Sequence, residues 1–277
     1  MSNYLEYRFR VDAERRDILL AYLSRYPFDT FQETETGLSA YTAPGATPDR
    51  DAVATRTAPL GATFTVHEHA PENWNARWEA NFPPLRVGNF CGIRADFHPP
   101  TEGVRFDLVI HPKMAFDTGH HATTHQMVET LEHLDLAGKR VLDYGCGTGV
   151  LAILAKQLGA AYVHAVDIEA PAYENTLENA ARNGVRLETV RCGTLATTRD
   201  EAVFDVILAN INRNVILASL PELAQRCAPG GVLLTSGYLR ADAAQLDAAL
   251  EAHGFARVAR REREGWLCTH SRRLVGV

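Results

Sequence analysis

The sequence has no pair of cysteines at metal-binding or redox spacing. Its five cysteines are scattered over 277 residues, their number is odd, and no C-x-x-C pair occurs. They are Cys91, Cys146, Cys192, Cys227 and Cys268. This pattern argues against a disulfide framework and against a cysteine-based zinc site. We therefore expect most of these cysteines to be small, buried, apolar residues.

The sequence also lacks a membrane-spanning or secretory segment. No run of about 18 apolar residues occurs, and the N-terminal stretch MSNYLEYRFRVDAE contains no apolar signal region. Basic residues are not in excess either, because the formal net charge is −6. A broad nucleic-acid surface is therefore not favoured. Together these features predict a cytoplasmic protein with no membrane attachment and no direct nucleic-acid binding.

Residues 1–70 predict a small α+β domain. Hydrophobic residues make up 46% of the chain, which fits a globular protein, and the length allows one large and one small domain. Strand-like and helix-like patterns follow in the order β-α-β-β-α-β, which is typical of a ferredoxin-like domain. Within it, Thr47 and Pro48 predict the cap and first position of the second helix.

Residues 71–85 predict a short aromatic helix between proline-marked boundaries. Trp74, Trp78 and Phe82 recur at every fourth position and would share one helical face. We interpret this segment as a linker whose aromatic side chains anchor it against a domain. The alternative is a hinge or a substrate-facing aromatic surface.

Residues 86–277 predict the larger domain. Strand-like and helix-like segments alternate along it, which is typical of an α/β fold with a doubly wound, mostly parallel, Rossmann-like sheet. Two final strand-like runs, 256–263 and 266–274, have no helix between them and should pair antiparallel. We expect a sheet of seven strands in total.

The stretch VLDYGCGTGVLAI runs from a buried strand through three glycines into an apolar helix. Gly145, Gly147 and Gly149 permit a tight turn and let a ligand approach the backbone, and the helix N-terminus offers free N–H groups. A dinucleotide site requires G-x-G-x-x-G, whereas Val150 stands at the third glycine position here. G-x-G-x-G preceded by an acid, Asp143, is instead typical of class I S-adenosylmethionine methyltransferases.

Two polar residues at strand ends extend this candidate site. Asp167 ends the next strand, about 20 residues later, where a carboxylate can accept hydrogen bonds from two ribose hydroxyls. Asn210 ends the stretch FDVILAN, and such sheets bind ligands at the carboxyl ends of their strands. Three interpretations of Asn210 stay open: a contact to a methionine moiety, a group that orients an acceptor nitrogen, and a routine strand-end residue.

The motifs AFDTGHHATT, VLDYGCGTGVLAI, AVDIE and LANI, in this order, resemble the PrmA-type methyltransferases, which modify large-subunit ribosomal protein L-eleven. The resemblance covers nearly the whole chain and includes the aromatic segment NWNARWE. It implies S-adenosyl-L-methionine as cofactor and methyl transfer to lysine side-chain and/or N-terminal amines. It also implies a ribosomal protein of the large subunit as substrate, recognised by residues 1–70.

Carried over residue by residue, the resemblance and the glycine turn together predict the cofactor-binding positions Thr124, Gly145, Gly147, Asp167 and Asn210. We further expect Phe116, Thr118 and Asn210 to line the channel of the acceptor amine. The chain departs from the family pattern at Asp117, where the family has glycine, and at Asn212 and Arg213. Because a non-glycine residue adopts positive φ less readily, we expect the loop at Asp117 to be stiffer or differently placed than in the family.

Residues 111–124, HPKMAFDTGHHATT, hold three histidines beside an aspartate. His121 and His125 have the i, i+4 spacing of a helical metal site. Because the same stretch matches the loop that caps the methyl donor in the resembling family, we predict that it binds no metal.

Three other functions stay open at this point. An NAD-linked oxidoreductase is disfavoured by the absent third glycine. A non-catalytic binding module is disfavoured by the intact cofactor pattern. A class I methyltransferase could also act on another protein, a nucleic acid or a small molecule, although NINR after the strand differs from the N-P-P-Y-like element that usually accompanies base N-methylation.

Overall fold

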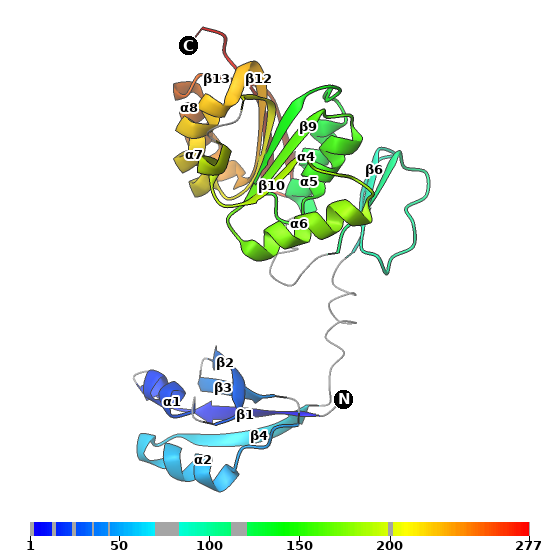
Figure 1. Cartoon of the computed structure of the whole chain (residues 1–277). Helices are drawn as coiled ribbons and strands as arrows, with labels where there is room; N and C mark the ends of the chain where they lie inside the picture. Colours follow the sequence, from blue (N-terminus) through cyan, green and yellow to red (C-terminus); the bar gives the residue numbers. More distant parts are fainter. Residues whose placement is uncertain are drawn as a thin grey trace. The chain divides into compact units, whose positions relative to one another are not determined.

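The computed structural model divides the chain into two units, Met1–Asn81 and Phe82–Val277, both drawn in Figure 1. The structure describes residues 3–12, 15–23, 26–34, 36–43, 45–69, 83–111, 121–198 and 202–276. At Asp17, Ala21, Glu33 and His121 it describes the backbone alone. The predicted aromatic helix, with Trp74, Trp78 and Phe82, lies outside the described residues.

The N-terminal unit has the predicted β-α-β-β-α-β order. Its elements are β1 (Tyr4–Arg10), α1 (Arg16–Leu23), β2 (Phe28–Thr34), β3 (Gly37–Thr42), α2 (Arg50–Thr57), the short 3-10 helix η2 (Ala58–Leu60) and β4 (Thr63–His69). The sheet order is β2-β3-β1-β4, and all three pairings are antiparallel. This order confirms the ferredoxin-like fold.

The core of this unit lies between the sheet and its two helices. Tyr7 and Phe9 of β1 are buried with Leu19 of α1 and Val53 of α2. Because side chains alternate between the faces of a strand, Glu6 and Arg8 of β1 lie on the opposite face of the sheet.

The start of α2 differs from its prediction. The N-cap is Asp49, whose carboxylate accepts hydrogen bonds from the backbone N–H groups of Asp51 and Ala52 at 3.0 and 3.1 Å. The prediction of Thr47 as cap, with Pro48 at the first helical position, is therefore wrong. Aspartate is as good a cap as serine or threonine, and here it alone satisfies two of the free N–H groups at the helix start.

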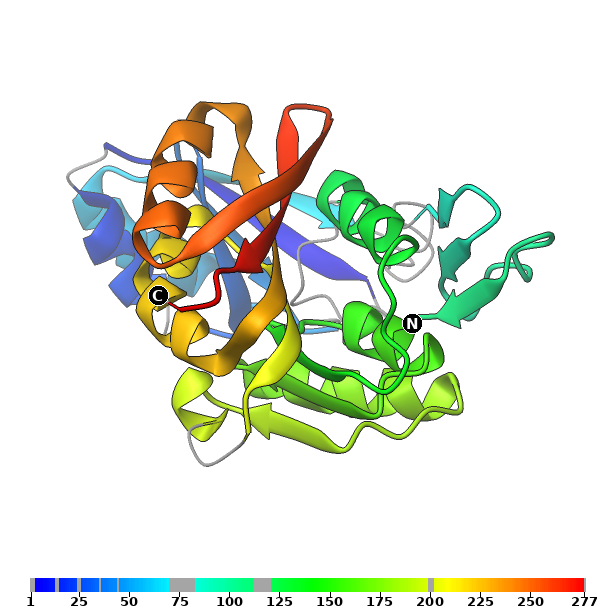
Figure 2. The same cartoon turned by 90° about the horizontal axis from the view of Figure 1, so that it is seen from above.

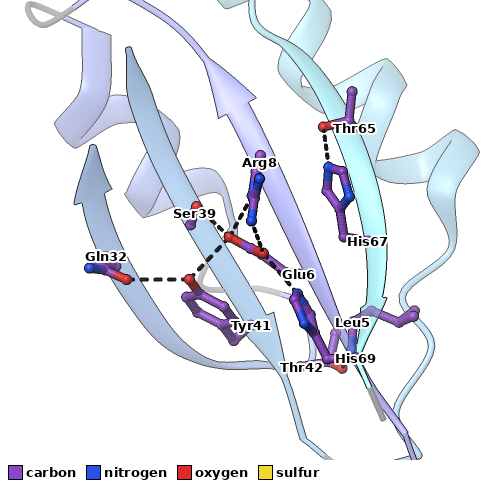
Figure 3. A network of polar contacts seen from close by, with 10 residues as sticks. All are labelled: Leu5, Glu6, Arg8, Gln32, Ser39, Tyr41, Thr42, Thr65, His67 and His69. Atoms are coloured by element: carbon purple, nitrogen blue, oxygen red, sulfur yellow. Dashed lines mark hydrogen bonds and ion pairs between the residues drawn. The ribbon is translucent and has the colours of Figure 1, made fainter. Parts of the chain in front are cut away.

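A polar network centred on Glu6 occupies the face of the sheet away from the helices (Figure 3). Glu6 is 3% exposed. It accepts hydrogen bonds from Arg8 Nε at 2.8 Å, Ser39 Oγ at 3.0 Å and Tyr41 OH at 3.1 Å, and its Oε2 lies 2.8 Å from His69 Nε2. Burial alone would raise the pKa of Glu6, but these hydrogen bonds outweigh burial and lower the pKa to about 2. The Glu6 carboxylate is therefore ionised, and its partners come from β1, β3 and β4.

The C-terminal unit is built on a seven-stranded sheet in the order β10-β9-β8-β11-β12-β14-β13. Its strands are β8 (Arg140–Tyr144), β9 (Tyr162–Asp167), β10 (Thr189–Cys192), β11 (Phe204–Asn210), β12 (Cys227–Leu239), β13 (Phe255–Arg263) and β14 (Trp266–Arg273). β8 to β12 pair in parallel, and β14 pairs antiparallel with both β12 and β13. The predicted doubly wound sheet of seven strands is confirmed. The strand order reverses between β8 and β11, which is where such sheets bind ligands.

Helices cover both faces of this sheet (Figures 1 and 2). One core cluster joins the sheet to α4 (His121–Leu131), α5 (Val150–Gln157) and α6 (Ala170–Arg182); the other joins it to α7 (Arg213–Arg226) and α8 (Ala243–Ala252). Short 3-10 helices occur at η4 (Leu195–Thr198) and η5 (Arg240–Asp242). In the ranges that the structure describes, no helix combines the length and the apolar character needed to cross a bilayer.

A separate three-stranded sheet precedes α4. It consists of β5 (Leu85–Val87), β6 (Cys91–Arg94) and β7 (Phe106–Val109), and it packs into the same core cluster as α4 and α5. The strand-like run GVRFDLVI contains β7. The sequence pattern did not predict β5 and β6, because strands of three or four residues are too short to show a clear period. All five cysteines are free, and all except Cys192 are buried, as expected.

Candidate active site

The glycine turn after β8 is left-handed at all three glycines, with φ of 73° at Gly145, 53° at Gly147 and 79° at Gly149. A Cβ added at Gly145 would lie 2.2 Å from Ile211 Cγ2, and one at Gly149 would lie 2.9 Å from Thr176 Cγ2. At Gly147, by contrast, a Cβ would meet no atom of the described residues within 4 Å. Gly145 and Gly149 therefore allow close packing inside the protein, whereas Gly147 is the open position where a ligand can approach the backbone.

Asp167, at the end of β9, is bound to the same turn. The backbone N–H of Gly147 donates to Asp167 Oδ2 at 2.9 Å, and that of Glu169 donates to Oδ1 at 3.0 Å. An ionised carboxylate has about four acceptor positions on its two oxygens. Each oxygen therefore keeps an acceptor position for a hydroxyl group, and the carboxylate is held rigidly beside the open glycine.

Asp143 lies beneath the turn and is 1% exposed. Its Oδ2 accepts a hydrogen bond from the N–H of Ala152, in the first turn of α5, at 2.9 Å. Burial raises the pKa of Asp143 to about 7, although the hydrogen bond from Ala152 opposes this change. Because the N-cap of α5 is Gly149, which has no side chain, Asp143 acts as the acceptor that satisfies this helix start.

Asn210 and Thr124 meet at the carboxyl end of β11. Asn210 Nδ2 lies 3.4 Å from Thr124 Oγ1, to which it donates, and Thr124 is in the first turn of α4. The next residue, Ile211, packs against Gly145. Since β11 and β8 are parallel neighbours, Asn210 lies at the same edge of the sheet as the glycine turn. The structure thus brings all five predicted cofactor-binding positions to one edge.

The two departures after β11 have structural partners. Asn212 caps α7, because its side-chain oxygen accepts a hydrogen bond from the N–H of Val215 at 3.1 Å. Arg213 forms an ion pair with Asp242 at 2.6 Å, and the hydrogen bond from Arg213 lowers the pKa of that carboxyl. The element NINR therefore starts a helix directly after the site.

Two residues of the predicted site, Phe116 and Thr118, lie outside the described residues. Their predicted roles stay predictions. His125, one turn into α4, has its Nε2 3.3 Å from a guanidinium nitrogen of Arg263. Within the described ranges, His, Cys, Asp and Glu side chains do not gather in threes that could hold a metal ion. The absence of a metal also stays a prediction, because residues 112–120 are not described.

A row of polar side chains on α6 is not among the predicted site residues. Thr176 Oγ1 donates to the carbonyl oxygen of Gly147 at 3.1 Å, and Asn179 Nδ2 donates to that of Thr148 at 2.9 Å. The signal in the sequence is the helical spacing of Asn and Thr in ENTLENAARN. It marks one polar face but does not show that this face is buried.

The strand order of the large sheet, the open glycine turn and the acid at the end of β9 define a class I S-adenosylmethionine-dependent methyltransferase. The family model described as ribosomal protein L11 methyltransferase (PrmA) matches residues 31–274. The chain belongs to the ribosomal protein L11 methyltransferase family. Membership supports the methyltransferase interpretation over the oxidoreductase and binding-module alternatives, and S-adenosylmethionine is the methyl donor.

The chain is similar to ribosomal protein L11 methyltransferases along most of its length. It is 42% identical over 256 residues to that of Porphyromonas gingivalis, covering 90% of this chain and 88% of the relative. It is 36% identical over 277 residues to that of Chlorobaculum tepidum, covering 96% and 95%. The crystal structure of ribosomal protein L11 methylase from Lactobacillus delbrueckii subsp. bulgaricus matches with a TM-score of 0.60 and 26% identity, over 69% of this chain and 97% of that one.

Proposed function

We propose that this chain methylates lysine side-chain and/or N-terminal amines of ribosomal protein L11 of the large subunit. The family match over residues 31–274 carries the proposal. Relatives that cover 90% and 96% of the chain are named ribosomal protein L11 methyltransferase. Because ribosomal proteins are made in the cytoplasm, the proposed reaction takes place there.

The residues at the edge of the sheet fit S-adenosylmethionine, which when bound supplies a methyl group activated by its sulfonium. We assign Gly145 and Gly147 to the backbone against which the cofactor packs, and Asp167 to its ribose hydroxyls. Thr124 and Asn210 are assigned to its methionine moiety. The open side of Gly147 and the remaining acceptor positions of Asp167 support this assignment.

The acceptor amine must lose a proton before it can accept a methyl group, since a lysine amine has a pKa of about 10.4. Partial desolvation and the nearby positive charge of the donor both lower that pKa. Because Asp143 is buried beneath the turn, it is not placed to take this proton from the amine. The chain therefore contributes chiefly by positioning the reactants. We propose that Phe116, Thr118 and Asn210 line the amine channel. The side-chain oxygen of Asn210 can accept a hydrogen bond from the amine.

We further propose that residues 1–70 recognise the protein substrate and that residues 71–85 link them to the methyltransferase domain, residues 86–277. The N-terminal unit has a hydrophobic core of its own, which supports a separate role. The glycine turn and the strand-end residues Asp167 and Asn210 all belong to the second unit. Two domains joined by one short linker can move relative to each other, which would let one active site reach several amines.

The test is incubation of the purified chain with methyl-labelled S-adenosylmethionine and purified L11, followed by peptide mapping of the label. Label on lysine side chains or the N-terminal amine of L11 supports the proposal. L11 left unlabelled by a chain that binds the donor would contradict it. A second class I methyltransferase that acts on small molecules is a suitable negative control.

A further inference from the structure

Helix α6 presents a row of polar side chains to the protein interior. Asn175, Thr176 and Asn179 are each 0% exposed, and Asn183 follows at the end of the helix. Burying an amide or hydroxyl group costs free energy unless the group is hydrogen-bonded. The hydrogen-bond partners of this buried row therefore show which parts of the chain it holds in place.

Two members of the row bind the glycine turn. Thr176 donates to the carbonyl oxygen of Gly147 at 3.1 Å, and Asn179 donates to the carbonyl oxygen of Thr148 at 2.9 Å. From the other side, the N–H of Gly147 donates to Asp167. The peptide groups before and after Gly147 are thus both fixed, and so is the next peptide along the turn.

The same row binds a second segment of backbone. Asn179 Oδ1 accepts a hydrogen bond from the N–H of His111 at 2.8 Å. Asn183 binds both the N–H and the C=O of Val109, at 2.9 and 2.7 Å. The amide of Asn179 therefore joins the glycine turn to the chain after β7, whereas that of Asn183 binds the end of β7 and the carbonyl oxygen of Asn179 in its own helix, at 2.8 Å, but not the glycine turn.

We infer that Thr176 and Asn179 are positioning residues for the methyl donor, an inference that rests on the cofactor site proposed above. Glycine adopts negative and positive φ about equally readily, so Gly147 does not by itself select its φ of 53°. The hydrogen bonds to Asp167 and from Thr176 fix the peptides on its two sides and so select it, and the hydrogen bond from Asn179 fixes the next peptide. A turn that is ordered before binding avoids the free-energy cost of ordering it when the ligand arrives.

The test compares Asn179→Ala with Asn183→Ala in the full chain. Each change removes one side-chain amide that binds two backbone groups outside α6, those of Thr148 and His111 for Asn179 and both groups of Val109 for Asn183. Asn183 also donates to the carbonyl oxygen of Asn179 within the helix. We expect both to lower the melting temperature. Only Asn179→Ala should weaken binding of S-adenosylmethionine by calorimetry, by roughly tenfold, the equivalent of about one hydrogen bond.

A second pair of variants keeps the inference testable if Asn179→Ala does not fold. Thr176→Val preserves the shape of the side chain and removes the hydroxyl, whereas Thr176→Ser keeps the hydroxyl. We expect Thr176→Val to weaken donor binding by roughly fivefold and Thr176→Ser to bind nearly as tightly as the unaltered chain.

Equal weakening of donor binding by the Asn179 and Asn183 variants would overturn the positioning role, because both would then act through stability alone. Unchanged binding by Thr176→Val would overturn it as well. The unaltered chain in the same titration separates this inference from the proposed function. If that chain does not bind the donor, the cofactor site itself is wrong.

Discussion

Replacing Asp167 with alanine should strongly weaken the binding of S-adenosylmethionine. In the proposed site the change removes an acceptor for two ribose hydroxyls, and a hydrogen bond to a charged group contributes about 1.5–3 kcal/mol. Two such bonds at the lower value give about 3 kcal/mol, or roughly a hundredfold in Kd. The change also removes the acceptor of the Gly147 N–H at 2.9 Å, which loosens the turn and acts in the same direction.

Isothermal calorimetry measures this effect directly, with Glu169→Ala as the matched control. Glu169 is exposed and carries the same charge two residues away, but only its backbone N–H contacts Asp167. We expect the control to bind the donor as tightly as the unaltered chain. The affinity of Asp167→Asn should fall between those of Asp167→Ala and the control. Thermal melting must first show that the variants are folded. A folded Asp167→Ala that binds no more weakly than Glu169→Ala would refute the assignment.

The folded-state pKa of Glu6, about 2, lies below its ordinary value of 4.5. The stabilisation from Glu6 is therefore complete above pH 4.5 and is lost as the pH falls toward 2, by at most ~3 kcal/mol. Across this range the melting temperature should fall more steeply with pH for the unaltered chain than for Glu6→Gln. Parallel curves for the two proteins would contradict the network. A chain that begins at Pro83 keeps β5, and melting must first show that it is folded. It should then retain donor binding but lose most transfer to L11. Transfer at the full rate would disprove the recognition role of residues 1–70. Elemental analysis of protein purified without an affinity tag should find no stoichiometric metal, and chelation should leave activity unchanged; zinc lost together with activity would make the histidine stretch a metal site.

The fold could be predicted in outline because its determinants are local and periodic. Alternation in the strands and helical spacing in between predicted the order of elements in the N-terminal unit and in the seven-stranded sheet with its helices, but not the separate three-stranded sheet. The turn has positive φ at Gly145, Gly147 and Gly149. Glycine in a sequence indicates positions that can adopt such φ values. Asp167 and Asn210 were recognisable because each ends a strand of the sheet.

The remaining features depend on packing that no local pattern reveals. Asp143 precedes the glycines in the sequence, but only the structure shows that it is buried and accepts a hydrogen bond from the N–H of Ala152 at the start of α5. Gly145 and Gly147 look alike in the sequence, yet one packs on Ile211 and the other is open. In the sequence Asn179 looks like an ordinary helical asparagine. Only the structure shows its hydrogen bonds to the backbone of Thr148 and His111.

The most direct test of the central claim is a methyl-transfer assay on a mixture of substrates. The purified chain is incubated with labelled S-adenosylmethionine and the total protein and RNA of large ribosomal subunits from a strain that lacks the endogenous L11 methyltransferase. The label is then located by electrophoresis and mass spectrometry. We predict that it appears on amines of L11 and that Asp167→Ala greatly reduces it. Label found on ribosomal RNA or on a different ribosomal protein, with L11 unlabelled, would contradict the proposed function.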